Sequence, residues 1–211
     1  TASSLYEALD EWIEEMKAHD VPDWYIWSCQ KIKYMFPKAH AAAYVMMAWR
    51  IAYCKVYYPL AYYAAFFSIR ATAFNYELMC QGKEKLNYFI KDYEKRKDTL
   101  TKKEQDTVKD MRIVQEMYAR GFTFLPLDVY TAKARYFQII DGKLMPALNT
   151  IEGLGDKAAE AIEDAAKQGA FLSKDDFRQR TKVSKTVIDL MSDLGLLEGL
   201  PETNQLSLFD F

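Results

Sequence analysis

Apolar residues recur at helical spacing through the first seventy residues, and the pattern is interrupted at prolines. Ser3 or Ser4 can cap a first helix whose early turns are acidic, as the helix dipole favours. Pro22 stands in the first turn of a second helix, Pro37 interrupts it, and Pro59 ends a third helix and can open a fourth. We therefore expect helices at about residues 3–17, 23–35, 38–58 and 59–70.

The next stretch, Tyr76–Ala119, is charged and rich in helix-forming residues, and it predicts one or two exposed antiparallel helices. Composition changes at Gly121. Three short segments then have strand character: Phe122–Tyr130, Tyr136–Ile140 and Lys143–Leu148. The dipeptide Asp141-Gly142 predicts a hairpin turn between the last two.

Helical patterning returns at Ile151 and continues to about Leu197, and an acidic, extended tail follows at Leu200–Phe211. The pattern predicts a mostly α fold with a small β element. We divide it into a helical region at 1–120, a β-containing connector at 121–148, a helix-hairpin-helix domain at 149–199 and a tail at 200–211.

Charge is uneven although the net charge is only −2. Residues 1–20 carry six carboxylates and one lysine, whereas residues 21–70 carry six cations and one carboxylate, so a polyanion is drawn to the second stretch. The three cysteines lack metal-ligand spacing and predict buried free thiols, and we expect no metal site. No apolar stretch is long and uninterrupted enough for a membrane span, so we expect a cytoplasmic protein.

The segment Ile151–Ile162 has the pattern of a helix-hairpin-helix, with a Gly-Leu-Gly turn between two short helices. Its two glycines allow positive φ and close approach to another surface, and the amides that follow can hold a phosphate oxygen at a helix N-terminus. Leu154 fills the hairpin from inside, and Lys157 adds a cation. A site of this kind contacts the DNA backbone and carries no base information. The DNA-binding residues that we expect are Gly153, Leu154, Gly155, Asp156 and Lys157.

A second candidate surface lies on the helix that begins at Lys38. At about 100° per residue, His40, Tyr44 and Lys55 share one arc, with Arg50 beside it. Cations next to an aromatic ring suit a triphosphate or a strand backbone with a base stacked nearby. A buried helix with Tyr44 in the core and its cations reaching out to solvent fits the pattern equally well.

These residues resemble a known family. The run Lys33–Tyr44, with Val21–Ile26 before it and Arg50–Tyr53 and Tyr57–Leu60 after it, resembles the fingers of PolC-type polymerases, the C-family replicative DNA polymerases of low-GC Gram-positive bacteria. The hairpin and the ending Leu200–Phe209 fit the same family, and the motifs occur in the family's order. The resemblance extends from about Trp12 to the C-terminus.

The resemblance implies that the fingers bind the triphosphate of the incoming dNTP and pack the nascent base pair. The residues that match this region are Phe36, Lys38, His40, Tyr44 and Arg50. The family's palm, with the carboxylates that hold Mg²⁺, lies upstream, so we expect this portion to bind no cofactor and to be inactive alone.

The tail resembles the short motif with which bacterial proteins bind the β sliding clamp. An extended peptide can place Leu and Phe in adjoining apolar pockets while the Gln amide bonds to backbone. The expected clamp-binding residues are Gln205, Leu206, Ser207, Leu208 and Phe209. A tail folded back onto its own domain is the alternative.

The sequence therefore predicts the C-terminal part of a PolC-type polymerase. Its expected partners are primer-template duplex, dNTP, the clamp and the rest of the polymerase chain, in the replisome. The alternative is a stand-alone DNA-binding adaptor that tethers a partner to the clamp. A helix-hairpin-helix glycosylase or nuclease ranks last, because only Lys167 follows the hairpin where a catalytic residue would be needed.

Overall fold

The computed structural model describes residues 9–31 and 37–203. The chain divides into two compact units, Thr1–Ala52 and Tyr53–Phe211, which are described separately. The described residues are mostly helical, and their single sheet has two antiparallel strands, β1 and β2. The predicted fold class is confirmed. No helix among these residues has both the length and the apolar character needed to cross a lipid bilayer.

The first unit contains α2 (Leu9–Ala18), α3 (Asp23–Lys31) and most of α4 (Lys38–Tyr57). Ile13 of α2 and Ile26 of α3 are buried where these two helices pack together. The predicted start of the first helix and end of the second lie outside the described residues. The predicted third helix is confirmed by α4, of which no side chain is buried.

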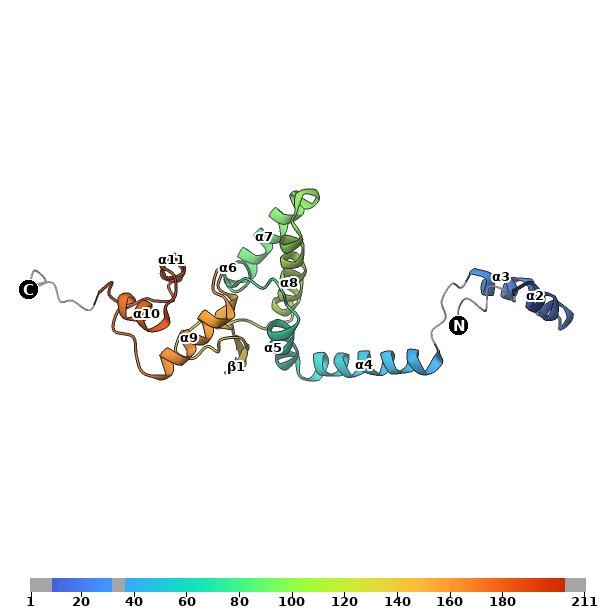
Figure 1. The fold of residues 1–211 in the computed structure, drawn as a ribbon, viewed down its shortest axis with the longest axis horizontal. Helices are drawn as coiled ribbons and strands as arrows, with labels where there is room; N and C mark the ends of the chain where they lie inside the picture. The colour runs from blue at the N-terminus through green and yellow to red at the C-terminus, as the bar shows by residue number, and fades with distance from the viewer. Residues whose placement is uncertain (1–8, 32–36, 204–211) are drawn as a thin grey trace, which may run out of the picture. The chain divides into compact units, whose positions relative to one another are not determined.

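The second unit begins with α5 (Pro59–Ile69), α6 (Tyr76–Met79), α7 (Lys83–Lys95) and α8 (Lys102–Ala119). A 3-10 turn, η1 (Lys97–Thr99), joins α7 to α8, and Figure 1 shows these two helices side by side. The prediction of antiparallel helices over 76–119 is confirmed. The predicted exposure of these helices holds for only part of their surface, because Leu86 and Ile90 of α7 are buried in the core.

The connector contains a small hairpin, β1 (Gln138–Ile140) and β2 (Lys143–Met145), joined as predicted by Asp141-Gly142. Both turn residues have positive φ, 49° and 73°, as the tight turn requires. The predicted strand at Phe122–Tyr130 is wrong. Only Phe124 forms a single bridge, to Leu144, because Pro126 has no N–H to donate to a ladder.

The C-terminal part contains η2 (Leu148–Thr150), α9 (Asp156–Lys167), α10 (Lys174–Thr181) and α11 (Lys185–Asp193). The predicted helical start at Ile151 is wrong, because a turn separates η2 from α9 and the first member of the hairpin is a single 3-10 turn. Pro146 shortens the last predicted strand to its first three residues.

Two apolar clusters form the core of the second unit. One lies among α5, α7 and α8 and includes Tyr63 and Leu144, and the other lies under α9–α11 and includes Ile162 and Met145. Successive strand residues point to opposite faces, so Leu144 and Met145 of β2 contribute to different clusters. The sheet thus connects the helical body to the hairpin region.

Candidate nucleic-acid interface

The hairpin turn depends on Gly153, whose φ is +78°. A Cβ at this position would meet Val187 Cγ2 of α11 at 3.4 Å, an ordinary van der Waals contact, so it is the positive φ that favours glycine. The amide of Leu154 donates to Ile151 O at 3.1 Å and closes the turn. Leu154 itself is 4% exposed, which confirms that its side chain fills the hairpin from inside.

Gly155 differs from the expectation for both glycines. It is the N-cap of α9 with φ −74° and ψ 164°, a conformation open to any residue, so the prediction of positive φ here is wrong. A Cβ at Gly155 would meet nothing within 4 Å. No contact among the described residues therefore requires glycine at this position. The absence of a side chain leaves the backbone open to approach from outside.

The first turn of α9 presents donors to this open side. The amides of Ala158 and Ala159 donate to Gly155 O, both at 3.0 Å. Those of Gly155, Asp156 and Lys157 have no acceptor within the described part of the chain. The helix dipole makes this end positive, and Lys157 stands exposed beside it. The geometry suits an oxyanion.

The helices behind the turn hold it in place. Ala159 and Ile162 of α9 are fully buried, as is Met191 of α11. Ser184 caps α11 by accepting from Val187 N at 3.4 Å. Helix α11 thus supports the hairpin by packing, with Val187 in van der Waals reach of Gly153 and in the same apolar cluster as Leu154.

Three carboxylates on α9 pair with basic residues of the connector. Arg135 lies 3.2 Å from Asp156 Oδ2 and 3.6 Å from Glu160 Oε1, and Lys133 lies 3.4 Å from Glu163 Oε1. No pattern in the sequence indicates that Arg135 or Lys133 contacts α9, because no periodicity relates an irregular connector to helix residues that follow twenty or more positions later.

Glu152 joins the hairpin to the helical body. One carboxylate oxygen accepts from Lys103 Nζ of α8 at 2.8 Å, and the other accepts from Asn75 Nδ2 at 2.9 Å. The hydrogen bond from Lys103 is the main cause of a lowered pKa for Glu152. These residues and both hairpin glycines line a pocket of about 600 Å³.

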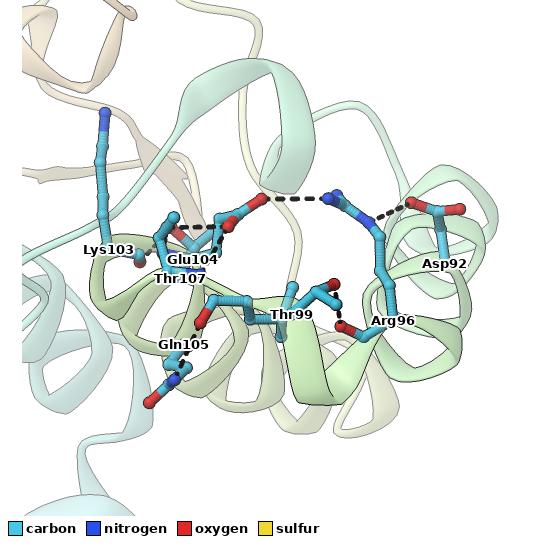
Figure 2. Close-up of polar contacts among 9 residues, drawn as sticks. Asp92, Arg96, Thr99, Lys103, Glu104, Gln105 and Thr107 are labelled. Carbon is cyan, nitrogen blue, oxygen red and sulfur yellow. Dashed lines mark hydrogen bonds and ion pairs between the residues drawn. The ribbon is translucent and has the colours of Figure 1, made fainter.

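The position of Lys103 is fixed by the start of α8. Thr101 and Glu104 form a capping box, and Glu104 also accepts from Arg96 Nη1 at 3.1 Å (Figure 2). Arg96 in turn donates to Asp92 of α7 at 3.3 Å. The hydrogen bond from the backbone N–H of Thr101 is the largest cause of the lowered pKa of Glu104. This network ties the end of α7 to the turn from which Lys103 projects.

The second candidate surface lies on α4. Lys38, His40, Tyr44 and Arg50 are all exposed there. The rings of His40 and Tyr44 lie 4.6 Å apart, and Arg50 Nη1 contacts Met47 Sδ at 4.0 Å. The alternative that places Tyr44 in the core is wrong, since its side chain is 67% exposed. Phe36 lies outside the described residues.

Lys55, which the sequence places on the same arc as His40 and Tyr44, pairs with a carboxylate of α8. Its amine donates to Glu116 Oε2 of α8 at 2.7 Å, and this hydrogen bond raises the pKa of Lys55. Tyr63 donates to the other oxygen of Glu116 at 3.2 Å, and Arg120 donates to the Tyr63 hydroxyl and to Lys55 O. This cluster fastens the last turns of α4 to α5 and α8.

Residues 121–206 match a protein-family model described as a helix-hairpin-helix motif. Over 199 residues, 94% of its length, the chain is 53% identical to the PolC-type DNA polymerase III of Caldanaerobacter subterraneus subsp. tengcongensis. It is 52% identical over 95% of its length to the protein of the same name from Listeria monocytogenes, and 48% identical over 94% to that from Bacillus subtilis.

The chain is homologous to a segment of PolC-type DNA polymerase III. It spans 14% of the length of each of these relatives. The resemblance carried by the runs around Lys38, by the hairpin and by the C-terminal motif is confirmed. The match includes α4 and the hairpin together, so both candidate surfaces lie within one continuous stretch that is similar to these relatives.

The tail motif of this PolC segment, Gln205–Phe209, lies outside the described residues. The residues just before it are held on α10. Lys174 N donates to Pro201 O at 2.9 Å, Asp175 N donates to Glu202 O at 3.1 Å, and the Lys174 amine pairs with the Glu202 carboxylate at 2.5 Å. The last of these anchored residues, Glu202, precedes the motif in sequence by three positions.

Proposed function

We propose that this chain is the C-terminal part of a bacterial replicative polymerase and that it holds primer-template duplex by its backbone. The observation that supports this most strongly is the hairpin. Gly153 sets the turn, Leu154 anchors it, and the amides of Gly155–Lys157 face outward without protein acceptors among the described residues. Backbone binding of this kind suits an enzyme that must move over every sequence.

The test is equilibrium binding of the 211-residue chain to two DNA duplexes of different sequence over a range of salt concentrations. We expect similar affinities for both duplexes, falling steeply and linearly on a log–log plot as counterions are released. Strong preference for one sequence, or affinity that does not change with salt, would contradict backbone binding.

The exposed surface of α4 is the proposed contact with incoming dNTP, with Lys38 in its first turn and His40, Tyr44 and Arg50 further along it. Lys38 and Arg50 supply cations for the triphosphate, while Tyr44 and its neighbour His40 offer a ring surface for the base pair. Phe36 is included in the proposed nucleotide site only because of the family resemblance.

Phosphoryl transfer itself is assigned to the rest of the polymerase, where the family resemblance locates the palm carboxylates and Mg²⁺. The described residues contain no group of three or more His, Cys, Asp or Glu side chains that could hold a metal ion. No metal-dependent step is assigned to this chain. Its part of the reaction is binding and orientation of the duplex and the nucleotide.

The tail is the proposed contact with the β sliding clamp. Gln205, Leu206 and Phe209 match the motif, and the anchored residues Pro201 and Glu202 give the peptide a fixed origin. A short segment tethered to a DNA-binding domain gains effective concentration when its partner encircles the same duplex. The adaptor alternative has the same tail, and the match of α4 to polymerase relatives favours the polymerase.

A further inference from the structure

The proposed phosphate site has an acidic residue where a phosphate would approach. Asp156 is the first residue of α9, and Glu160 lies one turn further on the same helix. Residues four apart share a helix face, so the two carboxylates form an acidic pair beside the outward-facing amides. An uncompensated pair there would repel the DNA backbone.

Arg135 compensates this acidic pair in the structure. Its Nη2 lies 3.2 Å from Asp156 Oδ2, and its Nη1 lies 3.6 Å from Glu160 Oε1. Asn149 Nδ2 donates to the remaining oxygen of Asp156 at 3.0 Å. Both oxygens of Asp156 are therefore engaged, and its side chain is held by the connector and η2.

The backbone around Arg135 is itself fixed. Lys133 O accepts from Leu148 N at 2.9 Å, and Ala134 O accepts from Asn149 N at 3.0 Å. The amide of Ala134 donates to Glu163 of α9 at 2.7 Å, which is the first cause of a lowered pKa for Glu163. This short segment lies along α9 and brings the guanidinium to the acidic pair.

We propose that Arg135 is a positioning residue of the DNA interface, which holds the carboxylates of Asp156 and Glu160 and offsets part of their charge so that the amides of Gly155–Lys157 can donate to a phosphate. The inference rests on the proposed DNA binding by the hairpin. Arg135 acts through the carboxylates: both of its terminal nitrogens are directed to them, and the phosphate is bound by the amides and Lys157.

A double-mutant cycle on the full chain separates this role from a direct phosphate contact. Binding to a short DNA duplex is measured by fluorescence anisotropy at one salt concentration. We expect Arg135→Gln to raise the Kd roughly fivefold in the natural background, since it removes one positive charge and also frees the carboxylates of Asp156 and Glu160 to turn toward the duplex. In the background Asp156→Asn with Glu160→Gln, the same change should raise the Kd only about twofold, because the charge is still lost but no carboxylate is left to hold.

An equal loss of affinity in both backgrounds would mean that Arg135 contacts phosphate directly, and no loss in either would mean that it has no part in binding. Both results overturn the proposal. Arg135→Lys keeps the charge and should bind within about twofold of the natural chain. If Arg135→Gln lowers the Tm so far that the chain is not folded, the Kd values of Arg135→Lys and Arg135→Ala are compared instead. This comparison uses the background Asp156→Asn with Glu160→Gln.

Arg112→Gln is the matched control. Arg112 is similarly exposed, 47% against 51% for Arg135, and it pairs with Glu94 on α7. We expect its Kd to equal that of the natural chain. If the natural chain binds no duplex at all, the proposed DNA binding fails. If it binds and Lys157→Ala weakens it while Arg135→Gln does not, only the present inference fails.

Discussion

Lys103 Nζ lies 2.8 Å from Glu152 Oε1, and this pair joins α8 to the hairpin turn across 49 residues of sequence. Asn75, which caps α6, donates to the other oxygen of the same carboxylate. A single side chain next to Gly153 thus links the DNA-facing turn to two elements of the helical body. Glu152 is 57% exposed, so its contribution is to orientation more than to stability.

Glu152→Gln should reduce the free energy of unfolding at neutral pH by less than about 1 kcal/mol, because exposed ion pairs are weak. The folded-state pKa of Glu152 lies below the ordinary value of 4.5. Its stabilising contribution is therefore complete above that value and is lost as pH falls through the lowered pKa.

Thermal unfolding of both proteins at pH 7 and pH 3 measures this linkage. The difference in Tm between the natural chain and Glu152→Gln should be present at pH 7 and shrink at pH 3. Glu198→Gln, at an exposed position, is the control and should show no such pH dependence. A difference that persists unchanged at pH 3 would contradict the ionic origin.

Substitution of the two hairpin glycines should change the free energy of unfolding to different extents. Gly153→Ala forces a Cβ onto a backbone with φ +78°, so we expect a loss of about 1–2 kcal/mol in unfolding free energy. Gly155→Ala meets open space at an ordinary φ and should leave stability within about 0.5 kcal/mol. Chemical denaturation measures both, and equal losses would contradict the different roles assigned to the two positions.

In the full polymerase, Lys38→Ala and His40→Ala should raise the KM for dNTP, by roughly tenfold for Lys38 if its ammonium contacts phosphate. Steady-state primer extension with varied dNTP measures this, with Lys143→Ala on β2 as an exposed control. If both α4 variants keep the natural KM and kcat, α4 does not face the nucleotide.

Removal of Gln205–Phe211 should abolish binding to purified β sliding clamp and leave duplex affinity unchanged. The deletion begins beyond the residues anchored on α10, so the Tm should also stay the same. Surface plasmon resonance with immobilised clamp gives the first result and anisotropy the second. Clamp binding that survives the deletion would place the contact elsewhere in the chain.

Local signals predicted much of this architecture. Prolines located the ends of α4 and the start of α5, and Asp141-Gly142 located the β-turn, because these residues restrict the backbone by themselves. The error at Phe122–Tyr130 has a physical reason. Phe124, Leu127 and Val129 are buried as strand residues would be, but by packing against the core, since Pro126 prevents a continuous ladder.

The candidate site was predictable only where it is local in sequence. Gly153, Leu154 and Lys157 adjoin one another, so the pattern identified them. Arg135 and Lys103 reach the hairpin region through the tertiary fold, from the connector and from α8, and no sequence spacing indicates their ion pairs.

The most direct test of the hairpin's role is the salt dependence of duplex binding by the natural chain, by Lys157→Ala and by Gly155→Val. We expect Lys157→Ala to weaken binding to every duplex sequence and to reduce the slope of log K against log salt by about 1, the loss of one phosphate contact. Gly155→Val should weaken binding, since its side chain occupies the open space at this position, and should lower the Tm only slightly, because Val is a poorer N-cap than Gly. Natural affinity and slope in both variants would contradict the account.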